Sequence, residues 1–223
     1  MNVDIICELG LNHDGDFYKA VGMIDMAAEA GIKTVKFQKY DPIKLLGPLS
    51  PYLAYATQCQ FSYKQLEGLK QICDGLGLEF LVSVFDLADI PWADSMCERH
   101  KVASRMNQNT DFMAALLMTS KPVIVSVQSS TPVTIKNVQY MFCIPEYPTS
   151  LARMDRLPCN ENLGLSSHCP SIAPTLKAIA QGARLIEHHV CIDRNESGCD
   201  KTSSITFDEL RQLNRFANQM VVV

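Results

Sequence analysis

The sequence lacks the features that mark several large classes of protein. Its charge is nearly balanced, with 20 Lys and Arg against 24 Asp and Glu, so no basic excess indicates binding to nucleic acid or an anionic membrane. No window approaches the roughly 18 apolar residues of a membrane-spanning helix. No basic segment followed by an apolar stretch opens the chain, so no signal peptide is visible. We therefore expect a cytoplasmic protein in which any anionic ligand is held by a local group of cations.

The cysteine pattern also argues against an extracellular scaffold. Nine cysteines are present, which is an odd number, and no two of them form a CxxC pair. Disulfide frameworks and structural zinc sites show even counts or such pairs. We expect reduced thiols that pack as small apolar groups, and we assign none of them as a nucleophile.

Short apolar runs alternate with amphipathic helical stretches along the whole chain, and no linker or low-complexity segment interrupts them. Each run is apolar at consecutive positions, as in strands that are covered on both faces of a parallel sheet. The predicted strands are Val3–Leu9, Thr34–Phe37, Glu79–Val84, Lys101–Ala103, Val123–Val127, Tyr140–Cys143, Leu163–Leu165 and Leu185–Val190. The predicted helices are Phe17–Ala30, Ser62–Leu76, Asp111–Thr119, Ala173–Gln181 and Phe207–Met220, with shorter ones at Leu87–Cys97, Val133–Asn137 and Ser150–Arg156.

Two α/β architectures compete for this pattern. A doubly wound sheet usually has five or six strands and a glycine-rich phosphate motif after the first one. Here the first strand leads into Leu9-Gly10-Leu11-Asn12-His13, which contains no GxGxxG. Eight units in 223 residues favour a compact (β/α)8 TIM barrel that forms a single domain over residues 1–223.

In such a barrel the active site lies at the carboxyl ends of the strands. Cationic and hydroxyl side chains gather at these predicted ends: Lys36, Ser83, Lys101, Ser104, Ser126 and Ser166. Two ammonium groups and several hydroxyls suit a phosphate together with a carboxylate. The alternative is that the lysines are merely the solvent-facing ends of their strands.

Histidines end two neighbouring predicted strands. His168 and His189 would bring two imidazoles together, and Glu8, Asp86 or Asp200 could complete a metal site with water. Such ligands suit manganese, iron, cobalt or zinc, and a water-rich site also accepts magnesium. A lone histidine at a strand end is more often a core or hydrogen-bonding group, so the pair carries the metal prediction. Side chains alternate along a strand, so either His188 or His189 should point away from the barrel axis.

Several segments match, in order along the chain, the motifs of one enzyme family. Residues 6–15 read ICELGLNHDG, similar to the family's opening "CEIGxNHxG". Further similar segments are AEAG and VKFQ at 28–38, KVAS at 101–104, KPVIVS at 121–126, EYPT at 146–149, GLSSH at 164–168, ARLIEHHVCIDR at 183–194 and GCD at 198–200. The sequence resembles the sialic acid synthases, which condense phosphoenolpyruvate with an amino sugar to form N-acetylneuraminate and related nonulosonates.

The resemblance implies a barrel fold, a divalent metal (most often Mn²⁺, with Mg²⁺ or Co²⁺ also suitable) and two small-molecule substrates, phosphoenolpyruvate and an aldose. By position it assigns phosphoenolpyruvate binding to Lys36, Ser83, Lys101, Ser104, Ser126 and Ser166, and metal binding to His168 and His189. It implies catalytic roles for Glu8, His168, His189 and Asp200, and sugar contacts for Gln38, Tyr147 and Asp200.

The chain also departs from the family pattern. Met106 stands where the family has a glutamate that binds the amino sugar, and the family's C-terminal antifreeze-like domain is not expected within residues 1–223. A homodimer or a partner chain would then supply the missing lid. The prediction is a sialic acid synthase-like transferase acting on an N-acetylmannosamine-like sugar or a smaller aldehyde. The alternatives are a non-catalytic paralogue that binds phosphoenolpyruvate or a sugar acid and acts through a partner, and a metal-dependent sugar isomerase on the same barrel.

Overall fold

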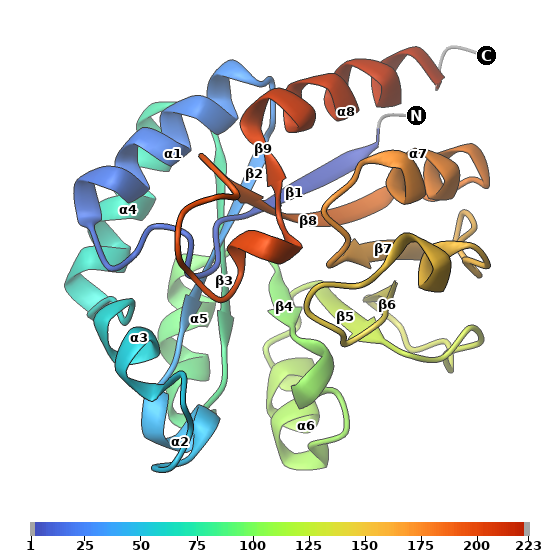
Figure 1. The fold of residues 1–223 in the computed structure, drawn as a ribbon. Coiled ribbons are helices and arrows are strands. Elements are labelled where there is room, and N and C mark those ends of the chain that lie inside the picture. Colours follow the sequence, from blue (N-terminus) through green and yellow to red (C-terminus); the bar gives the residue numbers. More distant parts are fainter. Residues whose placement is uncertain (1–2, 221–223) are drawn as a thin grey trace.

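A ring of parallel strands forms the centre of the computed structural model, which describes residues 3–220 (Figure 1). The strands of the ring are β1 (Asp4–Glu8), β2 (Thr34–Lys39), β3 (Glu79–Val84), β4 (His100–Val102), β5 (Val123–Val127), β6 (Val138–Cys143), β7 (Leu163–Ser167) and β8 (Leu185–Cys191). They follow the order β3-β2-β1-β8-β7-β6-β5-β4, and a short β9 (Ile205–Thr206) pairs with the end of β8. The predicted (β/α)8 barrel is confirmed, with all eight strands where the sequence placed them to within a few residues.

The ring closes between β3 and β4 without a backbone ladder among the described residues. A side chain bridges this seam, because the Ser83 hydroxyl on β3 donates a hydrogen bond of 3.1 Å to the Lys101 carbonyl on β4. At the amino ends of the strands, Arg99 directly precedes β4 and reaches across the seam toward β3 and β1. Its guanidinium lies 2.5 Å from Asp4 at the start of β1 and 2.7 Å from Glu79 at the start of β3. Two side chains therefore replace the missing strand pairing.

Most of the barrel wall is surrounded by helices, and the longer of them pack their apolar sides on the outward side chains of the strands. They are α1 (Phe17–Glu29), α2 (Pro42–Leu46), α3 (Leu53–Gln58), α4 (Tyr63–Gly75), α5 (Ile90–Met96), α6 (Thr110–Met118), α7 (Ala173–Ala180) and α8 (Phe207–Met220). The two capping motifs at α4 and α8 fix where these helices begin: Ser62 exchanges hydrogen bonds with Gln65, and Thr206 with Glu209. Both starts follow from the sequence.

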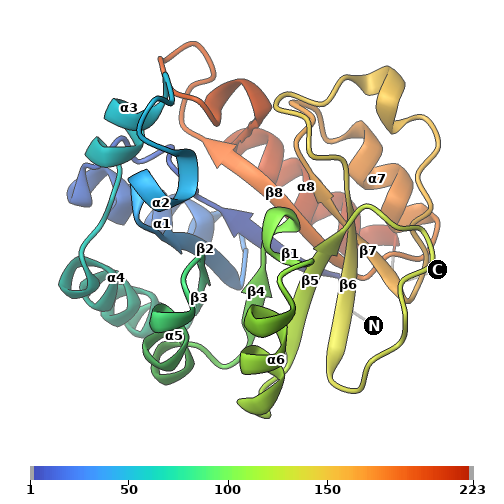
Figure 2. The same cartoon turned by 90° about the horizontal axis from the view of Figure 1, so that it is seen from below.

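One side of the barrel differs from the prediction. The expected helix at Val133–Asn137 is wrong, since the chain between β5 and β6 forms no helix. The expected helix at Ser150–Arg156 is reduced to a 3₁₀ turn, Leu151–Met154. The β-branched residues Val133, Thr134 and Ile135 make up most of this segment and lower its helix propensity. Within residues 3–220 no α-helix directly follows β5 or β6, and these strands are visible between α6 and α7 (Figures 1 and 2).

The thiols follow the expectation from the sequence. All nine cysteines are free, and eight of them are buried. Within the described residues no helix has the length and apolar character needed to cross a bilayer.

Replacing Arg99 with Ala tests the side-chain closure of the seam. The substitution leaves Asp4 and Glu79 without their shared partner, and a charged, partly buried hydrogen-bonded group is worth roughly 2–3 kcal/mol. We expect Arg99→Ala to lower the free energy of unfolding by about that amount in urea titrations. Arg156→Ala, at an exposed arginine, should change it by less than ~0.5 kcal/mol. Equal losses in the two variants would show that Arg99 does not help to close the barrel.

Candidate active site

Four buried charged residues meet inside the barrel: Glu8 on β1, Lys36 on β2, Lys101 on β4 and Glu187 on β8. We call them the four-charge cluster. The Lys36 ammonium lies 2.7 Å from a Glu8 carboxylate oxygen and 3.7 Å from one of Glu187. The Lys101 ammonium lies 3.5 Å from the other oxygen of Glu187. All four side chains are at most 6% exposed, so cations and anions alternate in a site with little water.

The predicted serines surround this cluster. Lys36 donates to the Ser83 hydroxyl at 3.3 Å, and Lys101 donates to that of Ser126 at 2.8 Å. The Ser166 hydroxyl donates to Glu187 at 2.9 Å. The hydroxyl of Ser104 is buried and has no hydrogen-bond partner within residues 3–220. The structure thus brings together the two lysines and three of the four serines in one network, with Ser104 buried and unpartnered.

Glu187 is the member of the cluster that the sequence analysis did not assign. It stands two residues before His189 on β8, and alternation along a strand points both side chains inward. Burial raises the pKa of its carboxyl, but the Lys101 and Lys36 ammonium groups outweigh burial and lower this pKa to about 2. A glutamate within a predicted strand, in phase with His189, was the available signal.

The two lysines differ in how well their charges are compensated. Burial lowers the pKa of Lys36, but the nearby carboxylates of Glu187 and Glu8 outweigh it and raise the pKa above its usual value. For Lys101, burial prevails and the pKa is lowered, since only Glu187 lies close enough to form an ion pair among the described residues. Lys36 is the firmly charged cation of the cluster.

The predicted metal ligands are brought together at the ends of β7 and β8. The ring centroids of His168 and His189 lie 5.4 Å apart. His168 donates from Nδ1 to the Ile144 carbonyl at 2.9 Å, which leaves its Nε2 lone pair available. Burial and the neighbouring His189 lower the pKa of His168 to about 3, so the ring is neutral at pH 7. His188 points outward and is fully buried between the barrel wall and its surroundings, as the alternation requires.

These donors suit a divalent cation in part. Neutral imidazoles with free lone pairs are the form that binds metals, and the buried Nδ1 of His189 has no hydrogen-bond partner in the described chain. Asp200 lies 3.8 Å from this nitrogen, whereas Glu8 and Asp86 are engaged by Lys36 and Lys44. Within residues 3–220 no three His, Cys, Asp or Glu residues are gathered closely enough to hold a metal by themselves. The pair therefore fits an ion that takes its other ligands from water or substrate.

The residues predicted to contact a sugar lie around the histidines and Glu8. Gln38 donates to Glu8 at 2.5 Å. The ring of Tyr147 stacks on His168 with centroids 3.9 Å apart, while 54% of the residue remains exposed. Asp200 accepts a hydrogen bond of 3.1 Å from the Leu11 amide. Gln38 therefore adjoins the four-charge cluster, whereas Tyr147 and Asp200 adjoin the two histidines.

A hollow of about 210 Å³ opens at the rim above β2, β3 and β4. It is lined by Asp41, Lys44, Leu45, Phe85, Asp86, Arg105 and Met106. The Lys44 ammonium is paired with Asp86 at 2.5 Å, and Leu45, Phe85 and Met106 give the hollow an apolar wall. The connections after β2, β3 and β4 that line it follow the strands carrying Lys36, Ser83 and Lys101.

Comparison with known proteins shows which family this chain belongs to. The family model described as NeuB family matches residues 23–222. The chain belongs to the NeuB family. The human N-acetylneuraminate-9-phosphate synthase is 25% identical over 95% of this chain and 68% of its own length. The N,N'-diacetyllegionaminic acid synthase of Campylobacter jejuni is 28% identical over 94% of this chain and 73% of its own length.

The solved structure of a similar protein shows the same fold. The crystal structure of N-acetylneuraminic acid (sialic acid) synthetase from Leptospira borgpetersenii, in complex with citrate, superposes with a TM-score of 0.87. The two sequences are 25% identical, and the match covers 99% of this chain and 84% of the synthetase chain. The predicted family is confirmed, and the chain spans about two thirds of the length of the human relative.

Replacing Glu187 with Gln tests the charge balance of the cluster. The substitution leaves the buried Lys101 ammonium without its carboxylate partner and removes one of the two carboxylates that pair with Lys36. Removing one member of a buried ion pair costs roughly 3 kcal/mol. We expect this loss in the free energy of unfolding at pH 7, against almost none for Glu146→Gln in the exposed pair with Arg153.

Wild type and Glu187→Gln also differ in how their free energies of unfolding depend on pH, and the direction of this difference can be stated. The folded-state pKa of Glu187, about 2, lies below its ordinary value of 4.5. Its contribution is therefore complete above about pH 4.5 and is lost as the pH falls toward 2. The difference in unfolding free energy between wild type and Glu187→Gln should be largest near neutrality and narrow over that range. A difference that grows in acid would contradict the ion pairing.

Proposed function

We propose that this protein condenses phosphoenolpyruvate with an aldose, forming a carbon–carbon bond and releasing phosphate by cleavage of the C–O bond. The observation that carries the proposal is the four-charge cluster, in which two lysines and a set of serine hydroxyls converge at the carboxyl ends of the strands. The relatives support it, since their names describe synthases of N-acetylneuraminate 9-phosphate and of diacetyllegionaminic acid.

The cluster suits a small, multiply charged acid. Lys36 and Lys101 would hold the phosphate and the carboxylate of phosphoenolpyruvate, with Ser83, Ser104, Ser126 and Ser166 donating further hydrogen bonds. The partnerless Ser104 hydroxyl is a donor that such a ligand would satisfy. Two lysines and two glutamates sum to no net charge, so an entering anion would compete with Glu8 and Glu187 for the ammonium groups.

The same residues give the proposed reaction its geometry. His168 and His189 would hold the divalent metal, which when bound supplies Lewis acidity toward the aldehyde oxygen of the sugar. Glu8 lies beside Lys36 and Gln38, where it would move a proton at the sugar oxygen or at the attacking water. The lysines fix phosphoenolpyruvate against the aldehyde, and such positioning is worth several kcal/mol of the activation barrier. We propose Mn²⁺ as the ion, with Mg²⁺ or Co²⁺ as substitutes.

The aldose would extend toward Tyr147, Asp200 and the rim hollow. The hollow presents Met106 at the position where the family has a glutamate that binds the amino sugar, and a thioether cannot replace the hydrogen bonds of that carboxylate. We propose that the second substrate carries an apolar group at this position or is a smaller aldehyde.

Phosphate release measured with purified protein, Mn²⁺, phosphoenolpyruvate and a panel of aldoses tests this function. We expect release with at least one aldose, and a loss of about 10³-fold or more in His168→Ala and in Lys101→Met. Lys177→Ala, at an exposed lysine of α7, is the matched control and should keep full activity. Thermal melting verifies that each variant is folded.

Phosphoenolpyruvate added alone separates the two main readings. Binding raises the melting temperature according to its affinity. A rise in wild type that is absent in Lys101→Met, together with no phosphate release from any aldose, would establish the non-catalytic binding protein. If phosphoenolpyruvate neither raises the melting temperature nor yields phosphate with any aldose, both the catalytic and the non-catalytic form of the proposal are contradicted.

A further inference from the structure

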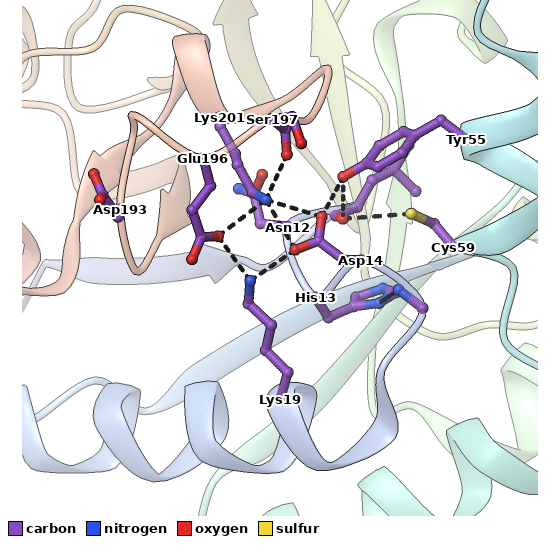
Figure 3. Close-up of polar contacts among 12 residues, drawn as sticks. Asn12, His13, Asp14, Lys19, Tyr55, Cys59, Asp193, Glu196, Ser197 and Lys201 are labelled. Atoms are coloured by element: carbon purple, nitrogen blue, oxygen red, sulfur yellow. Dashed lines mark hydrogen bonds and ion pairs between the residues drawn. The ribbon is translucent and has the colours of Figure 1, made fainter.

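A second group of charged residues lies beside the active site and joins two loops (Figure 3). Lys201 begins the 3₁₀ turn Lys201–Ser203 in the connection from β8 to α8, and Asp14 lies in the loop from β1 to α1. The Lys201 ammonium contacts both oxygens of Asp14, at 2.9 and 2.8 Å, and the Ser197 carbonyl at 2.6 Å. Lys201 is only 1% exposed, so this is a buried and multiply bonded cation.

Further partners complete this group. Glu196 lies 3.0 Å from the Lys201 ammonium and 2.8 Å from that of Lys19, which in turn lies 2.7 Å from Asp14. Tyr55 of α3 donates to Asp14 at 2.6 Å. Two cations and two anions therefore alternate, as Figure 3 shows, and tie three segments that are distant in sequence.

A separate link joins the same two loops a few residues away. The buried Asn12 amide donates to the Val190 carbonyl at 2.8 Å and to the Ser204 hydroxyl at 2.9 Å. The Ser204 hydroxyl donates to the backbone carbonyl of Asp200 at 2.7 Å. Asp200 thus sits directly between the Lys201 link and the Asn12 link.

The carboxylate of Asp200 has little freedom in this position. It accepts from the Leu11 amide and lies 3.8 Å from Nδ1 of His189. Gly10 packs against both groups: a Cβ added there would lie 2.7 Å from the Asp200 carboxylate and 3.1 Å from His189. The backbone of Gly10 is also left-handed, with φ of +50°. The loop after β1 therefore forms one wall of the Asp200 site, and any shift of that loop moves the wall.

We infer that Lys201 is a positioning residue, whose ion pair with Asp14 holds the loop after β8 against the loop after β1 and so fixes Asp200 beside His189. This role rests on the function proposed above, in which Asp200 contacts the aldose. Buried ion pairs add little net stability compared with apolar packing, but they specify one arrangement of the groups they join. An ammonium group satisfied by carboxylates from both loops gives the loops a single register.

The inference predicts an asymmetric effect on the two substrates. The phosphoenolpyruvate side is built from β2, β4, β5 and β7 through Lys36, Lys101, Ser126 and Ser166, and none of these residues contacts the Lys201 group in the described structure. Asp200, which is proposed to contact the aldose, directly precedes Lys201 in the chain. A change at Lys201 should therefore weaken the use of the aldose and leave the binding of phosphoenolpyruvate unchanged.

Lys201→Met tests this, with Lys177→Met as the control in an exposed lysine–aspartate pair. We expect the KM for the aldose to rise at least 10-fold and the midpoint for phosphoenolpyruvate, from thermal shifts, to stay within 2-fold. Asp14→Asn breaks the same link from the other loop and should give the same asymmetry. It also serves as the test variant if Lys201→Met does not fold. Equal weakening toward both substrates, or no change toward either, would overturn the inference.

Hydrogen–deuterium exchange gives a readout that does not depend on turnover. In Lys201→Met we expect faster exchange confined to residues 9–16 and 192–204, relative to Lys177→Met. If wild type turns over no aldose, the proposed function fails while local loosening still supports the link between the loops. Unchanged exchange in both segments would overturn the link itself, whatever the activity.

Discussion

The structure of the site depends on holding the ammonium groups of two lysines, Lys36 and Lys101, in the dry interior of a barrel. Burial alone opposes this strongly, because transferring an isolated ammonium out of water is costly. Glu8 and Glu187 both form ion pairs with Lys36, whereas Glu187 is the ion-pair partner of Lys101 in the described part of the chain. The lowered pKa of Lys101 shows that its compensation is incomplete. An anionic substrate that replaces the glutamates as partner would meet cations already held in place.

The barrel architecture is what makes such a cluster achievable. Glu8, Lys36, Lys101 and Glu187 come from strands that are far apart in sequence, yet parallel strands present their carboxyl ends on one side. The inward phase of each strand is fixed by its neighbours: Glu8 pairs in register with Lys36 on one side and with His189 on the other. A slip of one residue on any strand would turn its charged group outward. At the amino-end rim Arg99 adds side-chain contacts across the seam between β3 and β4, and at the opposite rim Lys201 joins two loops.

The sequence predicted the parts of this arrangement that depend on local pattern. Consecutive apolar residues located the strands, and their alternation with helical stretches indicated the barrel. The strand ends then identified Lys36, Lys101, His168 and His189. The predicted start of the helix at Phe207 is confirmed, because the Thr206–Glu209 capping box that sets it needs only residues three apart.

The remainder required the three-dimensional structure. The helix predicted at Val133–Asn137 does not form, because Val133, Thr134 and Ile135 are β-branched and favour extended backbone. Glu187 lay within a predicted strand beside two histidines, and its role appears only when the Lys36 and Lys101 ammonium groups are found close to its carboxylate. Lys201 and Asp14 are 187 residues apart, so no spacing in the sequence could pair them.

A crystal structure with phosphoenolpyruvate and Mn²⁺ bound tests the central claim most directly. The account predicts phosphoenolpyruvate oxygens within about 3 Å of both the Lys36 and the Lys101 ammonium groups, with the Glu8 and Glu187 carboxylates displaced or shared. Phosphoenolpyruvate bound elsewhere, with both lysines still paired only to their glutamates, would contradict it.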